Sequence, residues 1–224
     1  MVSRELIDTA EVPDGAPLRL FRRGGDFMIV MERNELMNSR MSGSEEALST
    51  LTAERLRGRA GQRWLIGGYG MGFTLRKALD ELGDDAGVVV AELVPKIIDW
   101  ARGPMAALAG GCLDDGRVRV VIDDVGRVIG GGQGRYDAIL LDVDNGPDGI
   151  VRAGNDGLYS DAGLRAAKAA LTPGGVLAVW SAAPDAAFVR RLKAAGFVVE
   201  EQAVRARASG KGPRHVIWLA QKRG

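Results

Sequence analysis

The chain has 224 residues, 46% of them hydrophobic, which is enough for the packed core of one domain with a small appendage. Its 30 Lys and Arg residues are balanced by 29 Asp and Glu residues, so we expect neither a nucleic acid nor a membrane as a partner. A single Cys and a single His exclude an internal disulfide bond and a Cys/His zinc cluster. The single Cys also fits a protein of the reducing cytoplasm. No apolar run approaches the ~18 residues of a membrane span.

Residues 1–58 are predicted to form the appendage. Residues 1–16 are polar and are interrupted by Pro and Gly, so we interpret them as an arm. The apolar runs 18–21 and 27–31 flank a Gly-Gly turn and predict a β-hairpin.

A helix is expected after the hairpin. Ser42 and Glu45 have the Ser-x-x-Glu spacing of a capping box, in which the two side chains bond to backbone N–H groups at the helix start. The helical pattern continues to about Arg57.

Residues 59–224 are predicted to form the main domain, in which strands alternate with helices. Apolar runs predict strands at 64–66, 88–91, 118–122, 137–141, 176–180, 197–205 and 215–220. Helical patterns are found at 75–82, 95–101, 161–171 and 184–195. This alternation predicts an α/β fold with a doubly wound, Rossmann-like sheet of seven strands. A tight turn joins the last two strands, so the last strand is antiparallel, as in the class I methyltransferase fold.

A glycine-rich loop follows the first strand of this domain. Its sequence is Gly-Gly-Tyr-Gly-Met-Gly, with glycines at Gly67, Gly68, Gly70 and Gly72. Between a strand and a helix, glycine permits positive φ and lets a ligand approach backbone N–H groups, although a tight turn alone would use the same residues. The spacing departs from the dinucleotide fingerprint by one residue and fits an S-adenosyl ligand, which has no pyrophosphate, better.

Acidic residues follow the next two strands. Glu92 lies 20 residues after Gly72, where a ribose-binding carboxylate sits in nucleotide-binding βαβ units, or it is a solvated acid at a strand end. Asp124 follows the third strand, where it could accept a hydrogen bond from an adenine amino group, cap the next short helix, or do both.

The fourth strand ends in a cluster of carboxylates, at Asp142, Asp144 and Asp148. Carboxylates at this edge of the sheet suit a cationic substrate, and one of them can take the proton of an attacking amine. The alternative is a turn whose Asp, Asn, Gly and Pro residues serve its backbone conformation.

Several of these motifs together resemble the spermidine/spermine synthase family. They are Ile66-Gly67-Gly68 with the glycines that follow, Glu92, Asp124, the segment 136–144, Gly157-Leu158-Tyr159-Ser160 and the Leu-Thr-Pro-Gly-Gly of 171–175. The resemblance implies transfer of an aminopropyl group from decarboxylated S-adenosylmethionine to a diamine, with release of methylthioadenosine. It also implies a homodimer, and the hairpin has edges suited to pairing.

The resemblance implies roles for single residues. Asp142 matches the catalytic aspartate, Glu92 the ribose carboxylate and Asp124 the adenine-binding aspartate. By family analogy Tyr159 covers the acceptor site, with packing in the core as the open alternative. Glu46 helps to hold the amine, and Asp144 attracts the same cation.

The acceptor half of the family pattern is altered in this sequence. Gly70 stands where the family has an aspartate, and Asn145 stands at its second fourth-strand aspartate. Ser44-Glu45-Glu46 replaces the family's Tyr-His-Glu, so only Glu46 matches. Trp180 is interpreted as a pocket wall or a core residue, and His215 as structural.

We therefore expect a transferase that moves an aminopropyl group to a small-molecule amine, with Asp142 as the base. Its co-substrate would be decarboxylated S-adenosylmethionine or S-adenosylmethionine itself, with no metal. Two alternatives stay open: a small-molecule methyltransferase and a nucleoside-binding module without activity.

Overall fold

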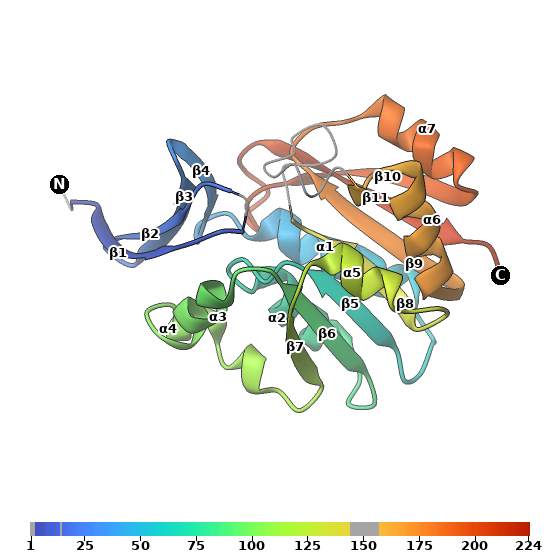
Figure 1. Ribbon diagram of the computed structural model, residues 1–224, viewed down its shortest axis with the longest axis horizontal. Helices are drawn as coiled ribbons and strands as arrows, with labels where there is room; N and C mark the ends of the chain where they lie inside the picture. Colours follow the sequence, from blue (N-terminus) through green and yellow to red (C-terminus); the bar gives the residue numbers. More distant parts are fainter. Residues whose placement is uncertain (1–2, 14, 144–156) are drawn as a thin grey trace.

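The computed structural model describes residues 3–13, 15–143 and 157–224. It contains a small antiparallel sheet near the N-terminus and a larger sheet with helices on both faces (Figure 1). The small sheet has the strand order β1-β2-β3-β4, with β1 (Glu5–Ala10), β2 (Leu18–Arg23), β3 (Asp26–Met31) and β4 (Asn34–Asn38).

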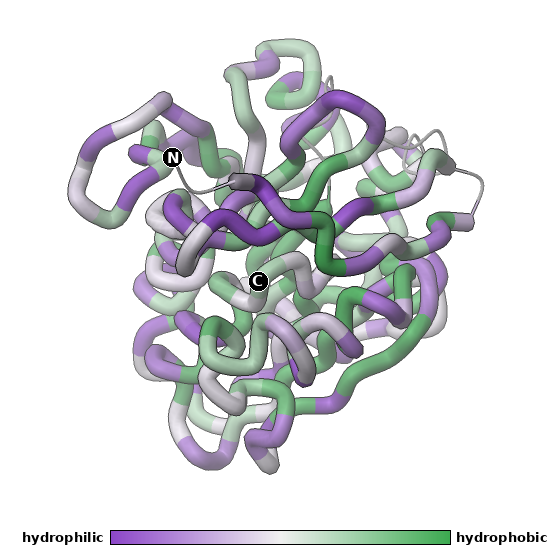
Figure 2. The backbone as a smooth tube through the Cα atoms, turned by 90° about the vertical axis from the view of Figure 1, so that its left-hand side faces the viewer, coloured by the Kyte–Doolittle hydropathy of each residue, from purple (hydrophilic) through white to green (hydrophobic). Residues whose placement is uncertain are grey.

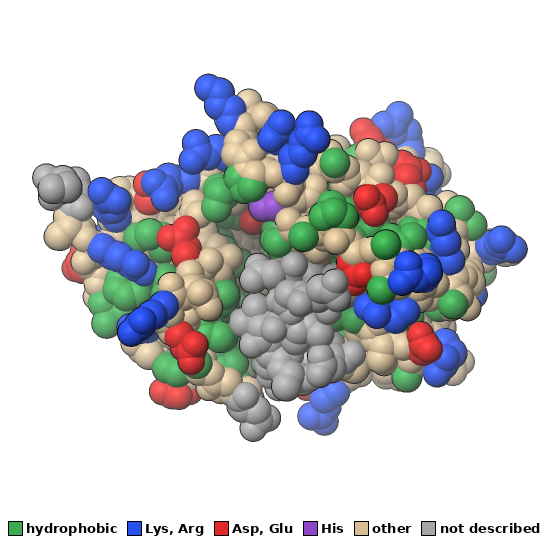
Figure 3. Space-filling model, turned by 90° about the horizontal axis from the view of Figure 1, so that it is seen from above, with side chains coloured by type: hydrophobic (Ala, Val, Ile, Leu, Met, Phe, Trp, Pro, Cys, Tyr) green, Lys and Arg blue, Asp and Glu red, His purple; other side chains and the backbone are tan. Residues whose placement is uncertain are grey.

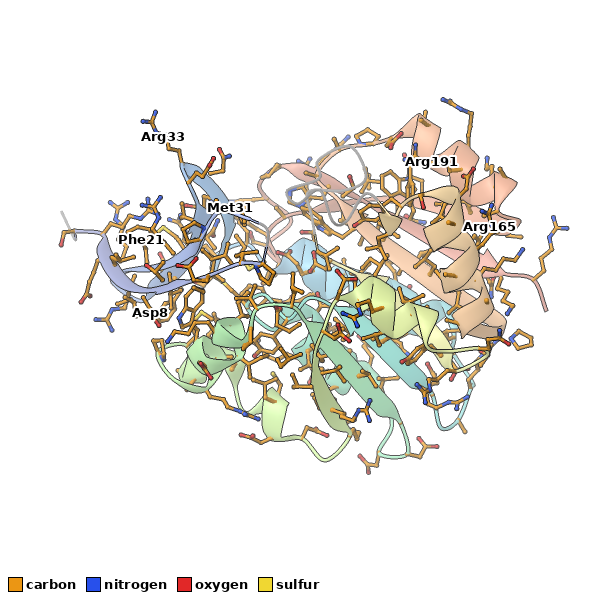
Figure 4. The ribbon with its side chains drawn as sticks, viewed as in Figure 1. Asp8, Phe21, Met31, Arg33, Arg165 and Arg191 are labelled. Carbon is orange, nitrogen blue, oxygen red and sulfur yellow. The ribbon has the colours of Figure 1, made fainter. Side chains whose placement is uncertain are left out.

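The predicted hairpin is therefore the centre of a four-stranded sheet, and the interpretation of residues 1–16 as an arm was wrong. The first strand is held through Asp8, which is labelled in Figure 4, by contacts that are distant in sequence. The indole N–H of Trp100 donates to Asp8 at 2.9 Å, and Lys96 forms an ion pair with Asp8 at 3.1 Å. Local periodicity gives no indication of such an anchor.

Side chains of the small sheet differ between its two faces. Leu18 and Leu20 are buried, whereas Arg19 and Phe21 between them are half-buried. Figure 2 views the molecule from the side on which the small sheet lies, and hydrophilic and hydrophobic residues alternate along the chain near the N-terminus. The pattern is that of an antiparallel sheet with one face on the protein and the other toward solvent.

The larger sheet confirms the predicted fold. Its strands are β5 (Arg63–Gly67), β6 (Gly87–Glu92), β7 (Val118–Ile122), β8 (Tyr136–Leu141), β9 (Leu171–Ser181), β10 (Phe197–Arg205) and β11 (Arg214–Lys222). They run in the order β10-β11-β9-β8-β5-β6-β7, and strands β5 to β9 pair in parallel. The last strand, β11, is antiparallel to both of its neighbours, β9 and β10.

Helices cover both faces of this sheet. They are α1 (Gly43–Arg55), α2 (Phe73–Glu81), α3 (Pro95–Arg102), α4 (Ala106–Ala109), α5 (Val125–Gly130), α6 (Asp161–Ala170) and α7 (Ala186–Ala194), with a 3₁₀ turn at Cys112–Asp114. Alternate residues of the strands belong to opposite cores: Trp64 and Ile66 pack with α1, α2 and α3, whereas Leu65 packs with α5 and α6. The two-sided burial explains why the strands read as continuous apolar runs.

The start of α1 differs from the predicted capping box. Ser42 is the N-cap residue, but its hydroxyl makes no capping hydrogen bond. The carboxylate of Glu45 instead accepts a hydrogen bond of 2.7 Å from the hydroxyl of Ser44. Ser-x-x-Glu spacing predicted the helix start correctly and the side-chain bonds wrongly.

The division of the chain at residue 58 stays a prediction. One hydrophobic cluster continues across it, from Leu20 and Ile29 through Leu48 and Leu56 to Trp64. Among the described residues, no helix has the length and apolar character needed to cross a membrane.

Candidate active site

A cavity of about 300 Å³ lies between the small sheet and the carboxyl ends of β5 to β8. The wall from the small sheet is largely apolar and includes Leu18, Ile29, Met31, Leu36 and Met37. Figure 4 shows Met31 on the side of the small sheet that faces the rest of the molecule, whereas Arg33 points away. The opposite wall carries the ends of the parallel strands, which is where doubly wound sheets bind ligands.

Two of the four predicted glycines line the cavity. Gly68 and Gly70 lie in its wall with φ of 81° and 56°, values that residues other than glycine rarely adopt. A Cβ atom on Gly70 would come within 2.8 Å of the terminal methyl of Met37. The loop therefore presents bare backbone to the cavity below the small sheet.

The other two glycines are explained by packing. A Cβ atom on Gly67 would lie 2.9 Å from a methyl of Val125, and one on Gly72 would lie 2.5 Å from the hydroxyl of Tyr69. Neither glycine is among the described residues that line the cavity. They support the loop that Gly68 and Gly70 present.

Glu92 ends β6 and is 5% exposed, which excludes the interpretation as a solvated acid. Its two carboxylate oxygens accept hydrogen bonds of 2.8 Å from the backbone N–H groups of Tyr69 and Val94. Burial raises the pKa of Glu92, while these hydrogen bonds act in the opposite direction. The carboxylate thus ties the glycine loop to the start of α3 and also lines the cavity.

Asp124 caps a helix, as one of its two predicted roles required, and its predicted contact with adenine stays a prediction. It is the N-cap of α5, where it accepts hydrogen bonds from the backbone of Gly126 at 2.8 Å and of Arg127 at 3.4 Å. It also lines the cavity beside Asp123. Capping a helix and facing a ligand are compatible because a carboxylate has several lone pairs.

Asp142 follows β8 and lies in the cavity wall with Glu45 of α1. The hydroxyl of Thr74, near the start of α2, donates to Asp142 at 3.1 Å. Burial raises the pKa of both Asp142 and Glu45, and the charge of Asp142 raises the pKa of Glu45 further. A cation in the cavity would relieve this repulsion.

The described residues do not place three other predicted site residues in the cavity wall. Glu46 is not among the described lining residues, and its neighbour Glu45 takes the place predicted for it. Tyr159 is 3% exposed and packs edge-on against Phe188 at 5.7 Å, also outside the described lining. Asp144 falls outside the described residues.

Trp180 and His215 line the cavity near Glu45. Their rings make an edge contact with centroids 4.7 Å apart, and Nδ1 of His215 lies 2.9 Å from the hydroxyl of Ser44. Figure 3 shows the histidine side chain in the wall of a hollow on the upper face of the molecule. The interpretation of His215 as merely structural missed this placement.

The charges of the lining are one-sided. Its described ionisable acids are Glu45, Glu92, Asp123, Asp124 and Asp142, and the described lining contains neither Lys nor Arg. A ligand with positive charge is therefore favoured over one with a carboxylate group.

The buried acids predict an unusual dependence of stability on pH. A raised pKa means that the folded state holds its proton at a pH where the unfolded state has lost it, so stability falls as pH rises above the ordinary carboxyl value. Each unit of raised pKa corresponds to about 1.4 kcal/mol. Glu45→Gln should therefore raise the unfolding temperature of the empty protein more at pH 8 than at pH 5.

Thermal unfolding at both pH values checks this expectation. Glu46→Gln, one residue along the same helix and outside the described lining of the cavity, is the matched control for the loss of a carboxyl group. An equal effect of Glu45→Gln at the two pH values would show that Glu45 ionises freely.

No family model matches the chain. A region of 144 residues is 33% identical to a polyamine aminopropyltransferase of Mycobacterium tuberculosis, and the enzyme of the same name from Mycobacterium bovis matches equally. The match covers 60% of this chain and 27% of each relative. The chain therefore matches about a quarter of the length of these curated relatives.

Solved structures share the fold over nearly the whole chain. Spermidine synthase from Thermotoga maritima matches with a TM-score of 0.77 at 19% identity, over 97% of this chain and 73% of that one. A spermidine synthase in complex with the transition-state analogue AdoDATO matches with 0.76 at 19% identity, over 97% and 72%. A methyltransferase from Burkholderia thailandensis with bound S-adenosylhomocysteine matches with 0.57 at 21% identity, over 81% and 79%.

The chain thus has the fold that spermidine synthases share with this methyltransferase, and its resemblance to the polyamine aminopropyltransferases, which the motifs indicated, is confirmed by sequence and by structure.

Proposed function

We propose that the chain transfers an aminopropyl group from decarboxylated S-adenosylmethionine to a small amine. The observation that carries this proposal is the charge of the cavity, whose described lining has five carboxylates and neither Lys nor Arg. Decarboxylated S-adenosylmethionine brings a sulfonium and an ammonium group, which such a wall attracts. S-adenosylmethionine also brings a carboxylate, which would lie among like charges without a Lys or Arg partner in the described lining.

The nucleoside would occupy the half of the cavity formed by β5, β6 and β7. Gly68 and Gly70 allow close approach to the loop backbone, and Glu92 would accept hydrogen bonds from the ribose hydroxyls. Asp124 would accept from the adenine amino group while it continues to cap α5. The apolar side chains of the small sheet would cover the ligand and exclude water from the sulfonium.

The acceptor amine would lie between Glu45 and Asp142. It arrives as an ammonium ion, and Asp142 takes one proton so that the nitrogen lone pair becomes available. The nitrogen then attacks the methylene carbon by which the aminopropyl group is bonded to sulfur. The bond between this carbon and sulfur breaks, and its electron pair stays on the sulfur of neutral methylthioadenosine. The new C–N bond places the positive charge on the product amine, so charge balances with one proton released.

The sulfonium is an activated leaving group, so the chain's own contribution is mainly the positioning of two reactants and the uptake of that proton. The raised pKa of Asp142 brings the carboxyl closer to the operating pH, which favours a general base. Glu45 would attract the ammonium group, the role that the sequence resemblance implied for Glu46.

Binding and turnover together test this proposal. Methylthioadenosine and decarboxylated S-adenosylmethionine should bind at least ten-fold more tightly than S-adenosylmethionine, and a panel of amines should yield a product heavier by one aminopropyl group. Calorimetry and mass spectrometry measure the two quantities. Tight binding of S-adenosylhomocysteine with a gain of one methyl group would instead establish a methyltransferase, and nucleoside binding without turnover would establish a binding module.

A further inference from the structure

The only histidine of the chain is linked to the acidic wall through one hydroxyl group. Ser44 Oγ lies 2.9 Å from Nδ1 of His215, and the same hydroxyl donates to Oε2 of Glu45 at 2.7 Å. The three side chains come from α1 and β11, which are far apart in sequence. Glu45 and His215 both line the cavity, whereas Ser44 is fully buried.

A serine hydroxyl has one proton, and this fixes how the three groups can be bonded. If Glu45 is ionised, Ser44 donates to Glu45, so Nδ1 of His215 must carry a proton and donate to Ser44. Nε2 then has a free lone pair. If Glu45 is protonated, its O–H can donate to Ser44, Ser44 donates to Nδ1, and the imidazole proton lies on Nε2.

We propose that Ser44 couples the charge of Glu45 to the tautomer of His215, so that an ammonium group bound at Glu45 turns Nε2 into a hydrogen-bond acceptor for the same amine. This rests on the proposed function, because it treats the Glu45 end of the cavity as the acceptor site. It adds His215 to the residues that hold the acceptor. It also restricts the acceptor to amines with at least two N–H bonds, one for each partner.

The surroundings of the imidazole fit a neutral ring. Burial lowers the pKa of His215. The ring of Trp180 makes an edge contact with the imidazole and covers one side of it. Burial and the charge of Asp142 favour the protonated form of Glu45 in the empty cavity. An arriving ammonium group offsets the negative charge of Asp142 and favours the ionised form of Glu45. The proton of Glu45 then passes to solvent, and the carboxylate pairs with the cation.

Nitrogen NMR of histidine tests the coupling directly. Because the chain has one histidine, ¹⁵N-histidine labelling of protein prepared with a histidine-free tag gives one pair of imidazole signals. Titration with putrescine as the probe, at a pH where the ring is neutral, should shift the proton from Nε2 to Nδ1. Tetramethylammonium has no N–H group to donate, so it should not produce the change in the Nε2 chemical shift that a hydrogen bond to Nε2 causes.

Ser44→Ala is the decisive variant, with Ser42→Ala as its matched control. Ser44→Ala removes only the shared hydroxyl, so the imidazole signals should no longer respond to putrescine, and KM for the amine should rise by about ten-fold or more with binding of methylthioadenosine unchanged. Ser42 lies two residues earlier and makes no capping hydrogen bond, so Ser42→Ala should behave like the unaltered protein.

The results separate this inference from the proposed function. A tautomer that is the same with and without putrescine, or a response that survives in Ser44→Ala, overturns the coupling even if aminopropylated product forms. A tautomer that shifts in the unaltered protein and not in Ser44→Ala supports the coupling even if no product forms, and in that case the proposed transfer fails by itself.

Discussion

Asp142→Asn is expected to lower turnover by about 10²–10⁴-fold, the usual contribution of a general base. The asparagine side chain has nearly the same shape but no basic oxygen, so the acceptor ammonium would keep its proton and its lone pair would stay unavailable. Binding of methylthioadenosine should change little, because Glu92 and Asp124 would still hold the nucleoside. Steady-state turnover and calorimetric titration of methylthioadenosine measure the two effects.

The folded protein should tolerate this change. The amide can still bond with the Thr74 hydroxyl that now donates to Asp142 at 3.1 Å, and a buried charge next to Glu45 is removed. Asp80→Asn is the matched control, since it alters an exposed carboxylate on α2, the helix that also carries Thr74. Turnover of Asp142→Asn at the unaltered rate would refute the assignment of Asp142 as the base.

The half of the site on the parallel strands could be predicted from the sequence. Glu92, Asp124 and Asp142 are far apart in the chain, but each lies within two residues of the end of a predicted strand. Because parallel strands end at the same edge of a sheet, this position alone brings the three carboxylates to one cavity. The glycine loop was predictable for the same reason, since it joins the first of these strands to its helix.

The acceptor half could not be predicted in this way. Ser44 and His215 are 171 positions apart, and their contact depends on how α1 packs against the start of β11. Glu45 fitted a capping box, a local interpretation that hid its place in the cavity. The first strand and the methionines of the small sheet likewise depend on tertiary contacts, which the pattern of one segment does not contain.

Gly43→Ala is expected to disturb the acceptor half of the site strongly. Gly43 is the first residue of α1, and its N–H donates to the carbonyl of Ala206 at 3.0 Å. A Cβ atom would lie 2.4 Å from the backbone carbonyl carbon of Arg207 and 2.5 Å from the nitrogen of Ala208. Backbone atoms cannot rotate away as a side chain can, so the start of α1 and the loop after β10 must separate.

The separation has consequences for stability and for the site. Overpacking of this kind costs about 1–3 kcal/mol of unfolding free energy. Since Ser44 and Glu45 follow directly, the hydrogen bonds of Ser44 to His215 and to Glu45 would also be disturbed, together with the position of Glu45 in the wall that contains Asp142. We expect a lower unfolding temperature and a loss of amine turnover of about ten-fold or more, with methylthioadenosine binding largely kept because the glycine loop and Glu92 lie on other elements.

Gly116→Ala is the matched control, because a Cβ atom at Gly116 meets nothing within 4 Å. The same one-carbon addition there should leave the unfolding temperature and turnover unchanged. Gly43→Ala protein with an unaltered unfolding temperature and an unaltered KM for the amine would contradict the argument. In that case the start of α1 could move without moving Glu45, and the acceptor site would not depend on the contact between α1 and the C-terminal strands.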